Sequence, residues 1–235
     1  MKTEVLTDSD AVAKRAAGLI AEAARAAAAE CGRFVMAVSG GHTPWVMLRA
    51  LAGEDVPWAA VHVVQVDERV APEGDPDRNL THLRESLLAH APVRPEQIHA
   101  MPVEAADLDA AAARYAAALR ELAGAPPTLD LVHLGLGPDG HTASLVPGDS
   151  VLDVADADVA LAGPYQGRRR MTLTYPAIGR ARRILWVVTG AEKASVLPRL
   201  IAGDGSIPAG RVPQDQAVLL ADQAAARGLP TSAVR

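Results

Sequence analysis

Aromatic residues and cysteine are scarce in this 235-residue chain. Phe, Trp and Tyr together make up 3% of it, and Cys31 is its single cysteine. One thiol excludes an intramolecular disulfide and any zinc cluster built on cysteines, and it suits a reducing compartment. Because 49% of the residues are hydrophobic but few are aromatic, we expect an aliphatic core lined with alanine.

The chain also lacks a long apolar run and an excess of positive charge. No window approaches the roughly 18 apolar residues of a membrane span, and the amino terminus has no signal-peptide core. Lys and Arg number 23 against 28 Asp and Glu, which argues against partners such as nucleic acid or a membrane surface. We therefore expect a soluble, cytoplasmic protein that acts on a small molecule.

Short runs of Val, Leu and Ile alternate with long alanine-rich stretches. The runs predict strands at 33–38, 61–66, 129–135 and 183–189, and the stretches predict helices at 9–30, 44–52, 79–89, 106–123 and 191–202, the first capped by Asp8 or Ser9. Continuous apolar strands are typical of a parallel sheet that is covered on both faces. With no linker and no internal repeat, the prediction is one α/β domain over 1–235, with a mainly parallel sheet and helices on both faces.

The first predicted strand ends in the turn Ser39-Gly40-Gly41-His42-Thr43-Pro44, which leads directly into a helical pattern. Glycines at such a turn let backbone N–H groups approach an anion, and the following helix adds positive potential. The turn matches neither the dinucleotide fingerprint nor a P-loop. It therefore indicates either an ordinary turn or a phosphate-binding loop.

The second predicted strand ends in Asp67-Glu68-Arg69, at the edge where parallel sheets bind their ligands. A solvated charge run is one interpretation. The other is a phosphate site in which Arg69 grips the anion and the acids orient that arginine or sugar hydroxyls.

The segment from Gly135 to Leu145, GLGPDGHTASL, carries the most specific pattern. Asp139 and His141 lie two residues apart in a glycine-rich turn, where the carboxylate would orient the imidazole for general-base work. A metal site is the competing interpretation. No three-ligand spacing and no G-x-S-x-G elbow accompany the pair, so we expect neither a metal, nor a cofactor, nor a serine nucleophile.

Two later segments add cations to the predicted sheet edge. Arg170 ends the run Arg168-Arg169-Arg170, and Lys193 follows the fourth predicted strand, past the same sheet edge as Arg69. A point charge at that place suits a phosphate dianion.

His62 and His133 lie inside apolar runs and are predicted to be core or sheet-face residues.

Together the segments SGGHTP, DERVAPEGDPDRN, GLGPDGHTASLVPG, RMTLTYPAI and TGAEKA resemble the 6-phosphogluconolactonase family from about residue 33 to residue 213. The resemblance implies a modified Rossmann-like fold that is shared with glucosamine-6-phosphate deaminase, and hydrolysis of 6-phosphogluconolactone in the pentose phosphate pathway. It also implies site roles: Asp139 and His141 would be the reacting pair, Arg69 and Lys193 would hold the phosphate, and the substrate would also be bound by Ser39, Gly40, Gly41, Thr43 and Arg170. Asp67 joins this predicted substrate-binding set because of its place after the second predicted strand.

The chain departs from the family pattern at three positions. His42 and Arg78 each stand where a serine is usual, and Val146 stands where a phenylalanine is common. These substitutions leave the reacting pair intact and alter the expected shape of the pocket.

Two alternative functions stay open beside the lactonase. A related deaminase would continue after the Asp-Gly-His triplet with an acid for proton relay, and Thr142 to Pro147 contain none. A non-catalytic sugar-phosphate sensor would need an output module, for which this chain has no spare length. Its partner is thus expected to be a sugar phosphate lactone, and its oligomeric state a monomer or a weak homo-oligomer.

Overall fold

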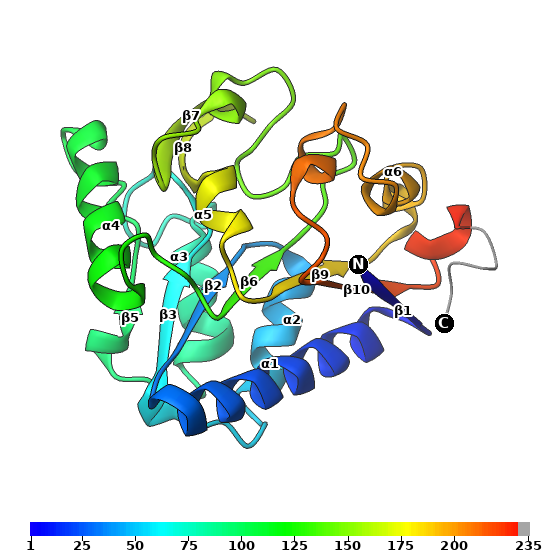
Figure 1. Cartoon of the computed structure of the whole chain (residues 1–235), viewed down its shortest axis with the longest axis horizontal. Coiled ribbons are helices and arrows are strands. Elements are labelled where there is room, and N and C mark those ends of the chain that lie inside the picture. Colours follow the sequence, from blue (N-terminus) through cyan, green and yellow to red (C-terminus); the bar gives the residue numbers. More distant parts are fainter. Residues whose placement is uncertain (230–235) are drawn as a thin grey trace.

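The computed structural model describes residues 1–229. Ten strands and six α-helices alternate along most of the described chain (Figure 1). The strands are β1 (Lys2–Leu6), β2 (Phe34–Val38), β3 (Val61–Gln65), β4 (Asp67–Arg69), β5 (Ile98–His99), β6 (Leu131–Leu134), β7 (Val159–Tyr165), β8 (Arg168–Leu173), β9 (Ile184–Val188) and β10 (Ala217–Asp222). The helices are α1 (Ser9–Cys31), α2 (His42–Leu51), α3 (Asn79–Leu83), α4 (Leu108–Ala123), α5 (Tyr175–Gly179) and α6 (Leu197–Ile201).

Seven strands form the main sheet, in the order β1-β10-β9-β6-β2-β3-β5, and every pair of neighbours is parallel. The chain builds outward from β2 in one direction through β3 and β5. It then returns to the other side of β2 with β6 and continues outward through β9 and β10. The strand order therefore reverses between β2 and β6, which is the place where open α/β sheets form a crevice for ligands.

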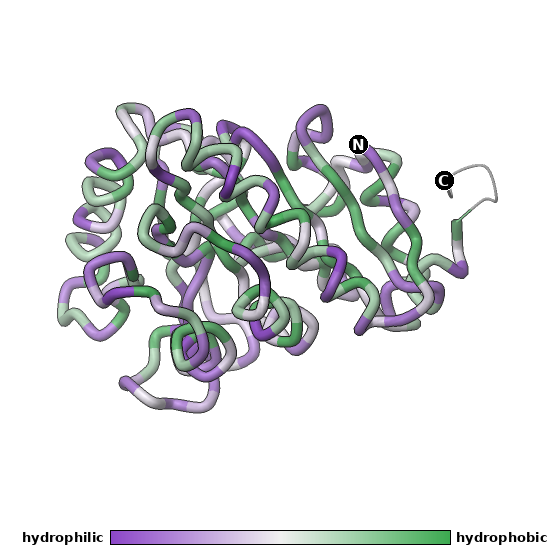
Figure 2. Tube along the Cα trace, turned by 90° about the horizontal axis from the view of Figure 1, so that it is seen from below, coloured by the Kyte–Doolittle hydropathy of each residue, from purple (hydrophilic) through white to green (hydrophobic). Residues whose placement is uncertain are grey.

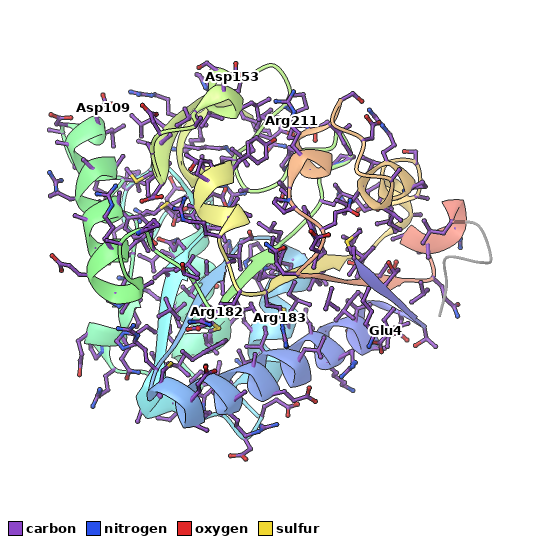
Figure 3. The ribbon with its side chains drawn as sticks, viewed as in Figure 1. Glu4, Asp109, Asp153, Arg182, Arg183 and Arg211 are labelled. Atoms are coloured by element: carbon purple, nitrogen blue, oxygen red, sulfur yellow. The ribbon has the colours of Figure 1, made fainter. Side chains whose placement is uncertain are left out.

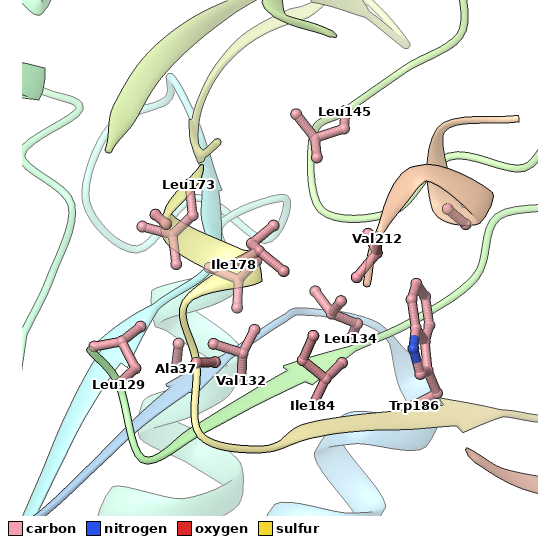
Figure 4. Packing of buried hydrophobic residues seen from close by; sticks show 14 of the residues in the cluster. Ala37, Leu129, Val132, Leu134, Leu145, Leu173, Ile178, Ile184, Trp186 and Val212 are labelled. Atoms are coloured by element: carbon pink, nitrogen blue, oxygen red, sulfur yellow. The ribbon is translucent and has the colours of Figure 1, made fainter. Parts of the chain in front are cut away.

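Both faces of this sheet are buried, because successive residues of its strands enter different hydrophobic clusters. In β2, Val35 and Ala37 pack with α4 and α5, whereas Phe34 and Met36 pack with α1 and α2. Figure 4 shows Ile184 and Trp186 on the first of these faces, in the same cluster as Ile178 of α5. This arrangement explains the unbroken apolar runs, which colour the interior strands green in Figure 2. The predicted sheet with helices on both faces is confirmed.

Alanine lets α1 lie close to the sheet. Its buried side is mostly alanine, and Val12 and Ile20 are its larger buried residues. The side chain of Asp8 accepts a hydrogen bond from the Ala11 N–H, which caps the helix as predicted. The helix ends at Gly32, whose φ of 72° is a left-handed conformation that glycine adopts without strain.

A second, smaller sheet was not predicted. It is antiparallel, in the order β4-β8-β7. Strands β7 and β8 are joined by the two residues Gln166 and Gly167, whose φ values of 52° and 77° are both positive. Positive φ at both central residues is the requirement of the tight type I′ hairpin turn, which fixes the pairing of Tyr165 with Arg168.

The four predicted strands are all present, and four predicted helices differ in extent, among them α2, which begins at His42 and ends at Leu51. The segment 79–89 continues from α3 into a π-helical turn at Arg84–Leu88, and α4 begins at Leu108. The segment 191–202 is divided into a 3₁₀ turn at Ala191–Lys193 and the short α6. Pro198 in the first turn of α6 has no N–H to donate to a preceding turn, so a continuous helix cannot run through it.

Exposed charged side chains lie at the periphery, among them the labelled Asp109, Asp153 and Arg211 (Figure 3). None of the helices within residues 1–229 is long and apolar enough to cross a membrane. His133 is fully buried in β6, as predicted for a core histidine, and burial lowers its pKa to about 3.

Candidate active site

An open cleft lies at the carboxyl ends of the strands, where the strand order reverses. The turns after β2 and β6 form part of its wall, and the small antiparallel sheet and the turn after β9 contribute the rest. Its lining comprises Ser39, Gly40, Asp67, Arg69, Asn79, Gly135, Leu136, Gly137, Pro138, His141, Ala143, Arg170 and Lys193. Seven of the ten predicted site residues are in this set, which brings together five segments that are far apart in the sequence.

Asp139 and His141 form a close pair in the turn after β6. The imidazole Nδ1 lies 2.6 Å from the Asp139 Oδ1, and the same oxygen accepts the backbone N–H of His141 at 3.1 Å. An ionised carboxylate can only accept, so Nδ1 carries the proton of a neutral His141 ring. The lone pair of the ring is then on Nε2, the nitrogen that this contact leaves uncommitted.

Tyr165 of β7, in the small antiparallel sheet, contacts both Asp139 and His141. Its hydroxyl donates to Asp139 Oδ2 at 3.1 Å and lies 3.4 Å from His141 Nδ1. Burial alone would raise the pKa of Asp139, but the backbone and ring hydrogen bonds from His141, with that from Tyr165, bring it below its usual value. Burial and the neighbouring carboxylate raise the pKa of Tyr165. At neutral pH Asp139 is therefore an ionised carboxylate that accepts a hydrogen bond from the protonated phenol of Tyr165.

Arg69 and Arg170 stand directly opposite each other in the antiparallel pairing of β4 with β8. Arg170 is 4% exposed, and burial together with the charge of Arg69 lowers its pKa. Within residues 1–229 no acceptor lies within hydrogen-bond distance of the buried Arg170 Nε. Two like charges facing each other across a sheet are destabilising, and an anion between them removes the repulsion.

Lys193 supplies a third cation from the 3₁₀ turn that follows β9. Its ammonium lies 3.7 Å from a carboxylate oxygen of Glu192, a contact at the outer limit of an ion pair. The side chain of Glu192 is mostly exposed, so solvent screens this pair. Lys193 is therefore available to an anion in the cleft.

The two acids that follow β3 are buried and serve different neighbours. Asp67 accepts from the Ser144 hydroxyl at 2.7 Å, and its backbone carbonyl accepts from the Asn79 side chain. Glu68 is fully buried, forms an ion pair with Arg78 and accepts the N–H groups that begin α3. Asp67 thus faces the cleft, whereas Glu68 fixes the segment that carries Asn79.

The turn after β2 is held by neighbours on both sides. Ser39 donates its hydroxyl to the His133 carbonyl of β6, and its N–H donates to the His133 ring. Gly40 lies against Asn79, where a Cβ would come within 1.8 Å of the amide oxygen, so any side chain at this position would have to displace Asn79. Thr43 lies 2.5 Å, oxygen to oxygen, from Thr189 at the end of β9. Thr43 and Gly41 do not line the cleft, and they shape the turn instead.

The sequence analysis missed Tyr165 and Asn79. Asn79 accepts from Arg69 and donates to Asp67, so it links two predicted residues. The dipeptide Gln166-Gly167 is a turn signal that could have placed a strand end at Tyr165. No local signal marks Asn79, whose role depends on the fold of the loop around it.

The cleft has no donor set for a metal and no cradle for a dinucleotide. In the described part of the chain no three His, Cys, Asp or Glu side chains gather closely enough to hold a metal ion. Gly135, Gly137 and Gly140 have the spacing of a dinucleotide fingerprint. However, β6 is followed by turns as far as Ser150, and the helix N-terminus that would receive a pyrophosphate is missing there.

Comparisons with known proteins agree with the observed fold. A relative in Synechocystis sp., a 6-phosphogluconolactonase, is 36% identical over 97% of this chain and 98% of its own. The structure of 6-phosphogluconolactonase from Trypanosoma brucei matches with a TM-score of 0.84 and 26% identity, covering 97% of this chain and 98% of that one. A monomeric glucosamine-6-phosphate deaminase has the same fold, with a TM-score of 0.85, 21% identity and coverage of 97% and 100%.

The model of one protein family spans nearly all of the described chain. It matches residues 7–220 and is described as glucosamine-6-phosphate isomerases/6-phosphogluconolactonase. The protein belongs to this family.

Proposed function

We propose that the protein hydrolyses 6-phospho-D-glucono-1,5-lactone to 6-phospho-D-gluconate, a step of the oxidative pentose phosphate pathway. The observation that carries the proposal is the position of His141, which lines one cleft together with Arg69, Arg170 and Lys193. A base and a cluster of cations in one cleft match a substrate with an electrophilic carbonyl at one end and a phosphate at the other. The names of the relatives described above support the same substrate.

In the proposed reaction His141 is the general base. Its Nε2 takes a proton from a water molecule while the water oxygen attacks the lactone carbonyl C1. Asp139 supports this role, because its short contact with Nδ1 fixes the tautomer and balances the charge that develops on the ring.

The attack places negative charge on the former carbonyl oxygen. Backbone N–H groups of the glycine turns are the proposed donors for it. When the intermediate collapses, the bond between C1 and the ring oxygen breaks, and the protonated His141 returns its proton to that oxygen. The products are an open-chain hydroxyl and a carboxylic acid, which then loses its proton to water.

Phosphate binding orients the reacting carbon. Arg69 and Arg170 are proposed to grip the anion from two sides, with Lys193 as a third contact. Fixing the phosphate at a distance from the base converts binding energy into alignment of C1 with the attacking water.

Deamination is the second candidate, since the family includes both activities. The segment that would have to supply the relay acid does not provide one. Leu145 is fully buried in the core, and Ser144 is committed to Asp67. Lactone hydrolysis needs only a base and an oxyanion site, so the composition of this segment favours the lactonase.

The product decides between the candidates. Freshly made 6-phosphogluconolactone should release acid faster with the protein than in buffer, after subtraction of spontaneous hydrolysis, and glucosamine 6-phosphate should release no ammonia. His141→Ala should lose about 10²- to 10⁴-fold in turnover, the usual cost of removing a general base. His90→Ala is the matched control, because it removes an exposed imidazole outside the cleft.

Two other outcomes would contradict the proposal. Ammonia without lactone hydrolysis would establish the deaminase, and sugar-phosphate binding with neither product would favour a sensor. A cytoplasmic location and a monomeric or weakly oligomeric state remain predictions.

A further inference from the structure

Tyr165 lies beside the two-residue turn that joins β7 to β8 in the small sheet. It is the last residue of β7 and pairs with Arg168 across the two-residue turn of Gln166 and Gly167. Positive φ at both turn residues is the geometry of a two-residue hairpin turn, which sets Tyr165 opposite Arg168. The side chain of Tyr165 therefore projects from the end of a paired strand, just after a register irregularity between Ala162 and Tyr165.

This side chain contacts both members of the Asp139–His141 pair. The hydroxyl donates to Asp139 Oδ2 at 3.1 Å, while Oδ1 is occupied by the ring and the backbone of His141. The Tyr165 and His141 rings meet edge to face, with centroids 5.1 Å apart. Each oxygen of the carboxylate thus has its own donor, and rotation of the carboxylate would break at least one of these bonds.

The same residue also contacts the proposed phosphate site. The Arg170 guanidinium lies 5.1 Å from the centroid of the Tyr165 ring, and its Nη2 donates to the Tyr165 carbonyl at 3.3 Å. A cation over an aromatic face is attracted to it. Tyr165 therefore contacts both Arg170 of the proposed anion site and the Asp139–His141 pair.

From these contacts we propose that Tyr165 is a positioning residue: its hydroxyl holds the Asp139 carboxylate in line with His141, and its ring and carbonyl hold Arg170. The inference rests on the proposed function for its kinetic consequence. Tyr165 does not act as a proton donor in the reaction, because its hydroxyl is committed to Asp139.

The two halves of this role are separable by substitution. Tyr165→Phe removes only the hydroxyl and keeps the ring and the carbonyl that contact Arg170. We expect kcat to fall about 10- to 100-fold with KM within about twofold, since a hydrogen bond to a charged group is lost away from the substrate. Tyr165→Ala also removes the ring, so KM should rise in addition. Tyr175→Phe is the control, because that hydroxyl donates to the Pro208 carbonyl outside the cleft.

A pH profile supplies a measurement that a merely structural role would not change. The charged groups around Tyr165 are Asp139, His141, Arg170 and Arg168, the strand partner of Tyr165, with Arg69 facing Arg170. All five remain in Tyr165→Phe. Loss of a donor to the carboxylate makes the first protonation of the Asp139–His141 pair easier. The acid limb of the kcat/KM profile should therefore move to higher pH in Tyr165→Phe and stay in place in Tyr175→Phe.

Nitrogen-15 NMR of the histidine rings tests the same point without turnover. The His141 signal is assigned by its loss in His141→Ala, and its titration midpoint should move to higher pH in Tyr165→Phe. An unchanged midpoint, or kcat and acid limb equal to those of Tyr175→Phe, would overturn the role of Tyr165. If the parent protein shows no lactone hydrolysis, the proposed function fails, and the NMR midpoint still decides whether Tyr165 positions the pair.

Discussion

Gly137 lies so close to the Asp139–His141 pair that adding one methyl group should displace the His141 ring and disable the proposed reaction. A Cβ built on Gly137 would lie 2.0 Å from His141 Nδ1, 2.2 Å from Cε1 and 2.7 Å from Asp139 Oδ1. Ordinary contact begins at 3.4 Å, so in Gly137→Ala the imidazole must move by about 1.4 Å. A displacement of about 1 Å at a reacting group costs roughly 10²-fold in rate. We therefore expect kcat/KM to fall about 100-fold.

The assay is acid release from 6-phosphogluconolactone, with the thermal midpoint measured on the same samples. The midpoint should change little, because φ at Gly137 is not positive and the His141 ring can swing toward the open cleft. Gly18→Ala in α1 is the matched control, since its Cβ meets nothing within 4 Å and alanine suits a helix. A Gly137→Ala rate within twofold of the parent, in folded protein, would refute the requirement for the observed Asp139–His141 geometry.

Two further predictions concern the anion site and metal dependence. Arg69→Ala and Lys193→Ala should each weaken substrate binding by about 1.5 to 3 kcal/mol. Sulfate or phosphate should compete with the substrate in the parent protein. Normal KM values in both variants and no competition in the parent would place the phosphate site elsewhere. Activity should persist in EDTA, since hydrolysis by His141 needs no metal, and loss that a divalent ion restores would overturn this mechanism.

The sequence was sufficient to predict the sheet edge that carries the cleft. Apolar runs identified β2, β3, β6 and β9, and in a parallel sheet their carboxyl ends share one side. Polar residues directly after those runs are therefore brought together wherever the strands pair. This argument found Arg69, His141 and Lys193 without any knowledge of side-chain contacts.

The sequence analysis did not predict strands whose local sequence pattern is weak. β1 (Lys2–Leu6) is an edge strand with polar residues, so neither periodicity nor an apolar run marks it. The strand β4 has only three residues, and all three are charged. A charge run of this kind becomes a strand only because β8 pairs with it, which is information from a distant part of the chain.

The contacts that join the parts of the cleft depend on this pairing of distant strands. The sequence analysis treated Arg69 and Arg170 as separate cations, 101 positions apart in the numbering. The register of β4 with β8 sets the two arginines opposite each other. The hairpin formed by β7 and β8 brings Tyr165 to Asp139. Repulsion between the two arginines is a cost that the folded protein bears when the cleft holds no anion, and a bound phosphate would relieve it. The small antiparallel sheet thus brings the proposed anion site into contact with the Asp139–His141 pair, through a strand register that no single motif could have indicated.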